Sequence, residues 1–422
     1  MASSPGVWMA SPLPEQSVGT VSASASERVT PYRVESTPRT RARIDSVDVV
    51  RGVIMILMAL DHTRDYFGFA GQSPTDLTTA SAALFMTRWI TNICAPVFFL
   101  LTGTGAYLSR RRRTPGNLAG FLFTRGLWLI VLDLVVLRCL AYQFNFDYRV
   151  TFLLVLWALG WSMIALAALV RLPAPVVTAI GAVMILGHNL LDSVRSANPI
   201  WSILHQPGFV LNSPAHIVFT AYPLIPWIGV TAVGYGLGQI YSWNAGRRRA
   251  FLLRLGALLT LGFVALRALN VYGDPSRWSH HDTTLYTVLS FVNTTKYPPS
   301  LLFLLMTLGP ALLFLGAVDF ATPRVLRPAI IFGRVPLFYY IVHFPLIHLL
   351  ALATCYVRYG SGHWMFESPD LAHYPFTQPP GWGFSLPVVY LVWALIVCAM
   401  YPLCHWYAAL KARRTDAWLS YI

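Results

Sequence analysis

The sequence predicts an all-α integral membrane protein with about ten transmembrane helices and both termini in the cytoplasm. Three observations support this: the composition, the length of the apolar runs and the positions of the arginines. Of the 422 residues, 56% are hydrophobic and only 11% are charged, whereas a soluble domain carries about 25% charged residues. The composition therefore excludes an ordinary soluble enzyme, a coiled coil and a disordered chain.

The apolar residues gather in ten runs, each close to the roughly 20 residues that a helix needs to cross a bilayer. The expected spans are 46–67, 89–108, 118–138, 150–170, 174–192, 217–240, 251–271, 299–319, 331–355 and 384–408. Residues 1–43 are rich in Ser, Pro and Thr and are expected to form a disordered cytoplasmic tail. Residues 44–410 would form the transmembrane domain, and residues 411–422 a short basic cytoplasmic tail.

Basic residues follow the even-numbered runs. The main groups are Arg110 to Arg113, Arg171, Arg247 to Arg249, Arg324 with Arg327, and Lys411 with Arg413 and Arg414. The positive-inside rule places these segments, and both termini, in the cytoplasm. The net charge of +14 does not indicate a nucleic-acid partner, because the basic residues lie between apolar segments and not on a polar domain. We expect a multi-pass protein with the lipid bilayer as a partner, and a homodimer is left open.

The first run carries an unusual set of ionisable groups. It begins with Asp48 and Arg51 and ends with Asp61-His62-Thr-Arg64-Asp65. Ionisable groups inside a span are costly and are functional-site candidates. Arg51 and His62 are eleven residues apart, so on an α-helix they differ by about 20° and lie about 16 Å apart along the axis. The alternative is structural: Asp48 with Arg51, and Asp61 with Arg64, could form local ion pairs.

This face presents a phosphate-seeking cation near the cytoplasmic end and a titratable base deep in the membrane. A long, thin, phosphorylated donor that enters from the cytoplasm would fit it, and coenzyme A has that shape.

The segments SVDVVRGVIMILMALDHTRDYF and ICAPVFFLLTGTGAYL resemble the heparan-α-glucosaminide N-acetyltransferase-like family, part of the transmembrane acyltransferase superfamily. The spacing Arg51-x10-His62 also resembles the first-helix motif of the acyltransferase-3 branch. The resemblance covers roughly residues 44–408. It implies transfer of an acyl group, such as acetyl, from cytoplasmic acyl-CoA to an extracytoplasmic sugar or glycolipid. It also implies a location in a bacterial inner membrane. The lysosomal members carry their histidine in the loop after the first span, whereas the loop from Gly68 to Arg88 has none here.

Under this hypothesis His62 is the catalytic residue, because a histidine suits general-base work at neutral pH. A covalent acyl-histidine intermediate is the alternative. Asp61 or Asp65 could orient the imidazole, as a carboxylate does in a catalytic triad. The expected ligands of the CoA phosphates are Arg51, Arg125 and Arg334, although Arg125 could instead extend its side chain back to the interface.

Three further residues are candidates for binding the acceptor: Arg64, Lys296 and His343. Lys296 could instead anchor a helix at the outer rim, and His343 could have a packing or hydrogen-bonding role. No metal or haem is expected, because the sequence contains neither a CxxCH nor an HExxH motif. The alternative function is a small-molecule or lipid transporter or flippase, which would share the composition and the central polar groups.

Overall fold

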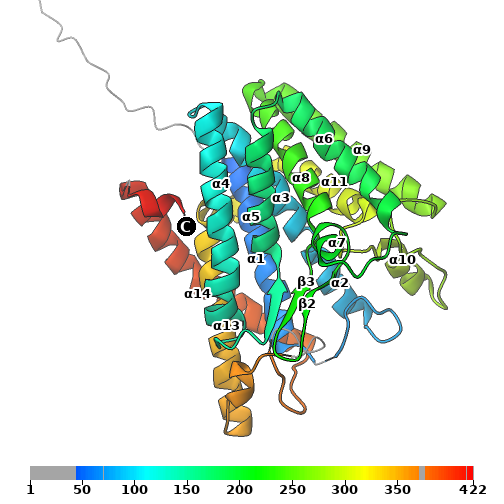
Figure 1. Cartoon of the computed structure of the whole chain (residues 1–422), viewed down its shortest axis with the longest axis vertical. Helices are drawn as coiled ribbons and strands as arrows, with labels where there is room; N and C mark the ends of the chain where they lie inside the picture. The colour runs from blue at the N-terminus through cyan, green and yellow to red at the C-terminus, as the bar shows by residue number, and fades with distance from the viewer. Residues whose placement is uncertain (1–43, 70, 370–375, 415, 422) are drawn as a thin grey trace, which may run out of the picture. The chain divides into compact units, whose positions relative to one another are not determined.

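The computed structural model describes residues 44–69, 71–369, 376–414 and 416–421. The expected tail of residues 1–43 lies outside this range. The described residues are mainly helical (Figure 1). Seven helices are long and apolar enough to cross a membrane: Ala82–Arg110, Pro115–Tyr142, Ala174–Leu191, Ala245–Leu269, Leu301–Val318, Pro336–Tyr359 and Leu386–Arg413. These helices identify a helical membrane protein, as the sequence predicts.

Three more helices lie in the remaining apolar runs. Helix α1, Asp45–Phe67, has the length of a span but carries acidic and basic residues in its first and last turns. Helices α5, Val155–Leu169, and α8, Leu224–Leu237, are shorter than a full span. Each of the ten expected runs therefore contains a helix, and ten crossings with cytoplasmic termini stay a prediction.

Several expected spans have different ends in the structure. The second run is longer and is divided into α2, Ala82–Thr91, and α3, Cys94–Arg110. Ser81 begins α2, since its side chain accepts a hydrogen bond from the backbone N–H of Leu84. The ninth run is likewise divided, into α12, Arg327–Arg334, and α13, Pro336–Tyr359. The last helix, α14, continues to Arg413, beyond the expected boundary at residue 410.

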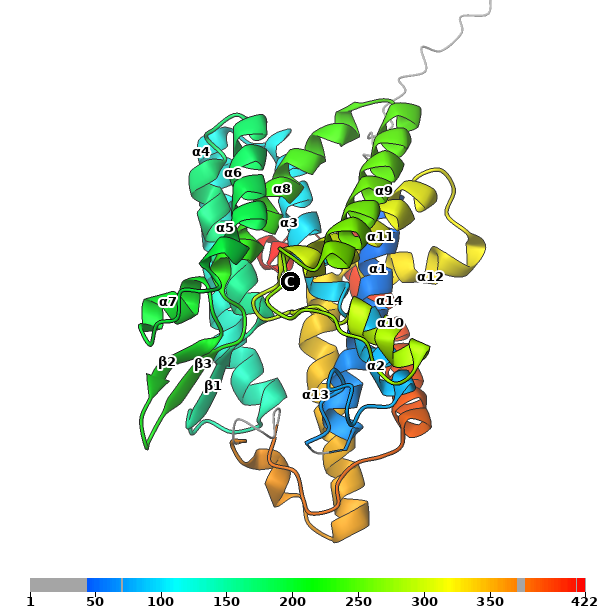
Figure 2. The same cartoon turned by 90° about the vertical axis from the view of Figure 1, so that its right-hand side faces the viewer.

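A small sheet is the part of the fold that the sequence did not predict. Strand β1, Val150–Leu153, pairs in parallel with β3, Ile217–Thr220, and β2, Gly208–Asn212, pairs antiparallel with β3 (Figure 2). The runs 150–170 and 217–240 were expected to be helical throughout, so their first residues are a correction. The sequences VTFL and IVFT consist mostly of β-branched and aromatic residues, which favour strands once a partner is present.

The other elements complete the chain. Helix α4, Pro115–Val131, continues directly into the π-helix η1, Leu132–Tyr142. The remaining helices are α6 (Ala174–Gly187), η2 (His188–Leu191), α7 (Pro199–Leu204), η3 (Gly238–Ser242), α9 (Ala245–Leu269), α10 (Thr284–Val292), α11 (Leu301–Val318), η4 (Arg324–Leu326), η5 (His363–Phe366) and η6 (Ala417–Ser420).

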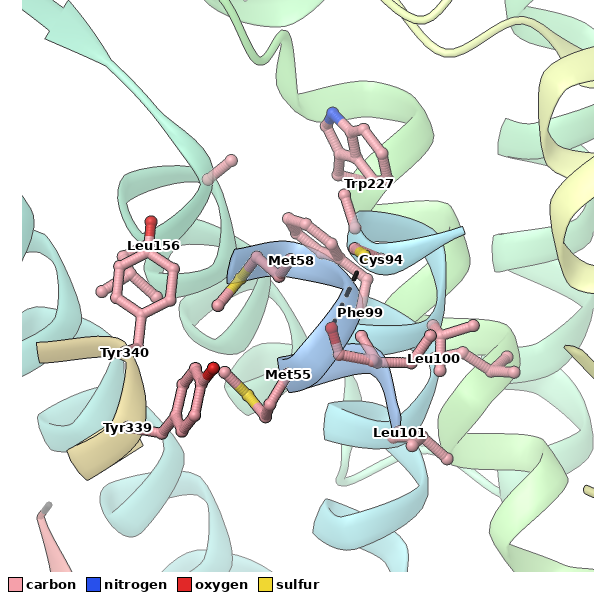
Figure 3. Close-up of a cluster of buried hydrophobic side chains, with 14 of the residues drawn as sticks. Met55, Met58, Cys94, Phe99, Leu100, Leu101, Leu156, Trp227, Tyr339 and Tyr340 are labelled. Atoms are coloured by element: carbon pink, nitrogen blue, oxygen red, sulfur yellow. Dashed lines mark hydrogen bonds between the residues drawn. The ribbon is translucent and has the colours of Figure 1, made fainter. Parts of the chain in front are cut away.

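Helix α1 lies at the centre of the packing and contacts α2, α3, α11, α12, α13 and α14. Figure 3 shows Met55 and Met58 of α1 packed among buried side chains of α3, α8 and α13. Glycines allow the closest approach: a Cβ added to Gly52 would lie 1.8 Å from the carbonyl oxygen of Ala329 in α12. The position of α1 is therefore fixed on several sides, which holds its polar residues in defined places.

Candidate active site

His62 of α1 faces α13, and its ring is held there by a second histidine. The Nδ1 atom of His62 lies 2.8 Å from Nε2 of His343. The ring of Phe344 lies 3.9 Å from the His62 ring, centroid to centroid. His343 is completely buried, whereas His62 is partly exposed. The two histidines are 281 residues apart in the chain, so only the packing of α13 on α1 joins them.

The hydrogen bonds of this pair assign the protons on both rings. Nδ1 of His343 lies 2.8 Å from the backbone carbonyl oxygen of Tyr339, which can only accept. Nδ1 of His343 must therefore carry a proton, and in the neutral ring Nε2 is then an acceptor. It follows that His62 donates from its own Nδ1. The Nε2 atom of His62 is left with its lone pair, which is the form that a general base needs.

The two carboxylates next to His62 in sequence bind arginines and not the imidazole. Asp61 forms ion pairs with Arg88 of α2 and with Arg64, the latter at 2.9 Å. Asp65 pairs with Arg64 at 2.7 Å. His343 holds Nδ1 of His62, which is the position that Asp61 or Asp65 was expected to occupy.

A cavity of about 530 Å³ lies against this cluster. His62, Asp61, Arg64, Asp65 and Arg88 line it together with an aromatic wall: Tyr66, Tyr142, Phe152, Phe219, Tyr222, Tyr297, Tyr340 and Phe344. We call this the His62 cavity. Sequence analysis did not identify Arg88 or these aromatic residues. The only signal for Arg88 was a charge at the start of an apolar run, and it was assigned to a loop.

Two predicted acceptor ligands lie outside the lining of the His62 cavity. His343 is buried behind His62 and touches the cavity only through it. Lys296 lies near the rim, with its Nζ atom 5.3 Å from the ring centroid of Tyr297. Tyr297 itself lines the cavity. Of the three predicted residues, Arg64 alone is part of the wall.

A second cavity, of about 340 Å³, lies toward the other end of α1 and is rich in basic residues. Its lining brings together Arg51, Arg125 and Arg334, the three cations expected to bind CoA, and adds Lys411. Arg51 contacts the carboxylate of Asp48 and the carbonyl oxygen of Gly333, each at 3.3 Å. Apolar side chains of α3, α4 and α5 form most of the remaining wall. We call this the basic cavity.

The two cavities meet at two residues. Tyr340 and Val155 line both of them. The Tyr340 hydroxyl lies 3.0 Å from that of Tyr142, which lies 3.3 Å from Oδ1 of Asp133. Asp133 also accepts a hydrogen bond from the backbone N–H of Trp157 at 2.9 Å. These hydrogen bonds connect a buried carboxyl group of η1 to the tyrosine that both cavities share.

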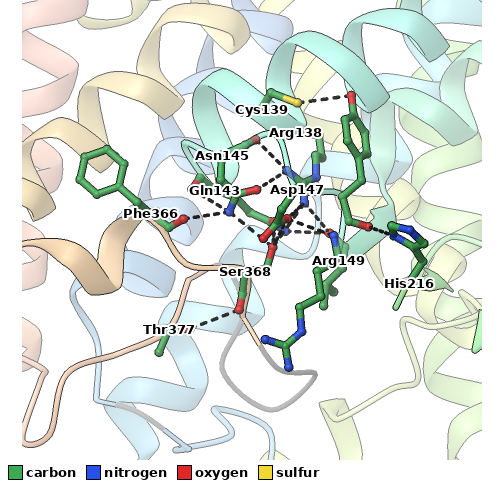
Figure 4. A network of polar contacts seen from close by, with 12 residues as sticks. Arg138, Cys139, Gln143, Asn145, Asp147, Arg149, His216, Phe366, Ser368 and Thr377 are labelled. Carbon is green, nitrogen blue, oxygen red and sulfur yellow. Dashed lines mark hydrogen bonds and ion pairs between the residues drawn. The ribbon is translucent and has the colours of Figure 1, made fainter. Parts of the chain in front are cut away.

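A polar clamp ties η1 to the start of β1 (Figure 4). Arg138, which is 2% exposed, donates to the backbone carbonyl oxygens of Asn145 and Val150 and pairs with Asp147 at 3.0 Å. Partial burial raises the pKa of the Asp147 carboxyl, but hydrogen bonds from Ser368, from the backbone N–H of Arg149 and from Arg138 outweigh it. The pKa of Asp147 therefore lies below its ordinary value, and the clamp is stable in its ionised form.

The comparisons with known proteins give one result. The family model described as heparan-alpha-glucosaminide N-acetyltransferase, catalytic, matches residues 43–273, more than half of the chain. The match includes His62, Arg51 and Arg125 and ends before α11. A search of curated proteins gives no match. In the described part of the chain, no group of three or more His, Cys, Asp or Glu side chains could hold a metal ion.

Proposed function

The chain belongs to the heparan-alpha-glucosaminide N-acetyltransferase catalytic family, and from this premise we propose that it moves an acetyl group from cytoplasmic acetyl-CoA to an extracytoplasmic sugar or glycolipid. The observation that carries this proposal is the pair of cavities. One is lined by basic residues and the other by a histidine whose Nε2 atom is unprotonated, and they meet at Tyr340 and Val155.

The basic cavity suits the donor. Coenzyme A carries phosphates, and arginine guanidinium groups bind phosphate with charge-assisted, often bidentate hydrogen bonds. Arg51, Arg125, Arg334 and Lys411 supply these charges. The apolar wall suits the uncharged arm that carries the thioester. In the orientation given by the positive-inside rule, this cavity opens to the cytoplasm.

The His62 cavity suits a sugar acceptor. Aromatic faces stack against the apolar faces of sugar rings, while Asp65, Arg64 and Arg88 offer polar groups to the substituents. The family description names a glucosaminide, which carries an amine that can receive the acetyl group. Glucosamine is therefore the acceptor to test first.

In the proposed reaction, Nε2 of His62 removes a proton from the acceptor amine or hydroxyl. The acceptor atom then bonds to the thioester carbon, and the carbonyl electron pair moves to the oxygen. When this intermediate collapses, the C–S bond breaks, and the CoA thiolate takes up the proton from the His62 imidazolium. The alternative is that Nε2 of His62 attacks the thioester first: the bond from Nε2 to the acyl carbon forms, the C–S bond breaks, and CoA leaves as the thiolate. The acceptor atom then bonds to the acyl carbon, the bond to Nε2 breaks, and the acceptor proton passes to the CoA thiolate.

Binding of acetyl-CoA to the detergent-purified protein tests the donor side first. We expect saturable binding that weakens in Arg51→Ala and persists in His62→Ala. With glucosamine as the acceptor probe, His62→Ala should lower turnover by about 100-fold or more, since general-base catalysis contributes 10² to 10⁴. If the folded wild type binds no acetyl-CoA, the proposal fails, and vesicle uptake would then test the transporter alternative.

Radiolabelled acetyl-CoA without an acceptor separates the two chemical routes. Label that stays with the denatured wild-type protein but is absent from His62→Ala would support the acyl-histidine route. A wild type that transfers acetyl to glucosamine yet traps no label would favour direct transfer with His62 as the base.

A further inference from the structure

Tyr340 has a place in the molecule that the roles assigned above do not explain. It is one of the two residues that line both cavities, and the other, Val155, has no polar side-chain atom. Tyr340 rises from α13 beside Leu156 of the basic cavity (Figure 3). Its ring meets the His62 ring edge-on, with centroids 6.1 Å apart. The side chain of Tyr340 therefore supplies the polar atom at the junction of the two cavities.

The Tyr340 hydroxyl ends a buried hydrogen-bonded chain that begins at Asp133. Asp133, Tyr142 and Tyr340 are 2%, 3% and 5% exposed. Asp133 and Tyr142 both belong to the π-helix η1 and are nine residues apart. On an α-helix nine residues make two and a half turns, which places them on opposite faces. The wider π winding makes about two turns of the same nine residues and brings them onto one face.

The direction of the hydrogen bonds that join Asp133, Tyr142 and Tyr340 depends on whether Asp133 carries a proton. If Asp133 were ionised, Tyr142 would donate to it and Tyr340 would donate to Tyr142. The hydroxyl proton of Tyr340 would then point away from the junction between the cavities. Burial disfavours an ionised carboxyl that no cation compensates. In the described part of the chain Asp133 forms no ion pair, and its partners are the backbone N–H groups of Trp157 and Leu154 and the Tyr142 hydroxyl. With a neutral carboxyl, Asp133 donates to Tyr142 and Tyr142 donates to Tyr340. The Tyr340 proton then points to the junction between the cavities.

We propose that Tyr340 is a catalytic residue whose hydroxyl donates a hydrogen bond to the acyl carbonyl oxygen at the junction. Tyr142 and Asp133 are positioning residues that direct this proton. The proposal rests on the acyl transfer described above. When the acceptor atom bonds to the carbonyl carbon, the π electron pair moves to the oxygen, and Tyr340 stabilises the developing charge without transferring its proton. As the C–S bond breaks, the carbonyl double bond forms again and CoA leaves as the thiolate.

Kinetics with acetyl-CoA and glucosamine test the role of the hydroxyl. Tyr340→Phe keeps the ring at the junction, so we expect kcat to fall 10²- to 10³-fold, the usual loss for one oxyanion donor, while KM for acetyl-CoA stays within about twofold of the wild type. An unchanged kcat in Tyr340→Phe overturns the proposal but leaves the acetyltransferase function standing.

Two substitutions at Asp133 test the direction of the proton chain. Asp133→Leu removes the donor to Tyr142 and should lower kcat. Asp133→Asn should recover most of that loss, because the amide N–H donates to Tyr142 while its oxygen still accepts from Trp157. If Asp133 had only a structural role, each variant that lowers kcat would also lower the melting temperature. Equal kcat in the Asn and Leu variants overturns the assigned direction.

Infrared spectroscopy of bound acetyl-CoA tests the contact without turnover. With the thioester carbonyl carbon ¹³C-labelled, its stretching band should lie at lower wavenumber on the wild type than on Tyr340→Phe, because a hydrogen bond weakens the C=O bond. His62→Ala is the matched control and should keep the wild-type band. If acetyl-CoA binds and its carbonyl band lies at the same wavenumber in the wild type and in Tyr340→Phe, the role of Tyr340 is overturned but the donor assignment stands. If no acetyl-CoA binds, the donor assignment itself fails.

Discussion

At the scale of single residues, the reactivity of His62 depends on a partner that is neither charged nor near it in sequence. His343 holds Nδ1 of His62, and the backbone carbonyl of Tyr339 holds His343. In a triad a carboxylate selects the tautomer and also stabilises the imidazolium. A neutral histidine can select the tautomer in the same way, but it offers no compensating charge. The nearby carboxylates Asp61 and Asp65 are already paired with Arg64 and Arg88.

Replacing His343 should therefore damage catalysis more than donor binding. We expect His343→Leu to lower kcat by about 100-fold, because Nδ1 of His62 loses its acceptor and the base loses its fixed tautomer. KM for acetyl-CoA should change little. Steady-state kinetics with acetyl-CoA and glucosamine provide the measurement.

His343→Gln is the matched control. The Gln carbonyl oxygen can accept from His62 while its amide donates to the carbonyl of Tyr339, so a large part of kcat should return. A Leu variant with wild-type kcat, or a Gln variant as impaired as the Leu variant, would show that the tautomer relay is not what His343 contributes.

At the scale of elements, the crossing of α1 and α12 sets the position of Arg51. Each helix contributes a glycine to the contact. A Cβ on Gly52 would lie 1.8 Å from the carbonyl oxygen of Ala329, and a Cβ on Gly333 would lie 1.8 Å from the carbonyl oxygen of Asp48. The same contact brings the Gly333 carbonyl oxygen to Arg51. Helices packed this closely in a membrane gain dispersion energy over their backbones.

Gly52→Ala should push α1 and α12 apart. Overpacking of this kind costs roughly 1–3 kcal/mol, so we expect a lower melting temperature in detergent and weaker acetyl-CoA binding. Gly262→Ala in α9 is the control, because a Cβ there meets no atom within 4 Å and the residue lines neither cavity. Equal melting temperatures of the two variants would contradict the packing argument.

The clamp around Asp147 predicts a pH dependence of stability. The folded pKa of this carboxyl is lowered, so its contribution is present above the unfolded pKa, about 3.9, and is lost as the pH falls through the lower folded value. We expect Asp147→Asn to melt below the wild type at pH 7. The difference should shrink below about pH 4.

Thermal unfolding of both proteins from pH 3 to pH 7 measures this effect. The Asp147 carboxyl is half exposed, and solvent screens its interactions. The difference in melting temperature between the two proteins should therefore be small. A difference that stays constant over this range would show that ionisation of Asp147 does not stabilise the clamp.

At the scale of the whole molecule, the proposed function depends on which side of the membrane each cavity faces. Cysteines at exposed positions near the helix ends test this orientation. We expect Gly71→Cys to react with a membrane-impermeant maleimide in intact cells. Gly246→Cys, in the first turn of α9 and next to the basic group Arg247 to Arg249, should react only after the cells are permeabilised.

The wild type serves as the control for this labelling, since its own Cys398 is exposed. Labelling of Gly246→Cys but not Gly71→Cys in intact cells would reverse the orientation. The basic cavity would then face away from the cytoplasmic pool of CoA, and the proposed direction of transfer would fail.

The sequence by itself determined the membrane class, a helix in each apolar run and the placement of Arg51 and His62 on one helix. These features are local: hydropathy and the 3.6-residue period act within one segment. Tertiary structure alone decided that His343 is the partner of His62, that Arg88 binds Asp61, and that VTFL and IVFT form strands. It also decided the π winding that joins Asp133 to Tyr142. The physical reason is that each of these features depends on packing or pairing between segments far apart in the chain, or on a change in helical winding, and no local period in the sequence records them.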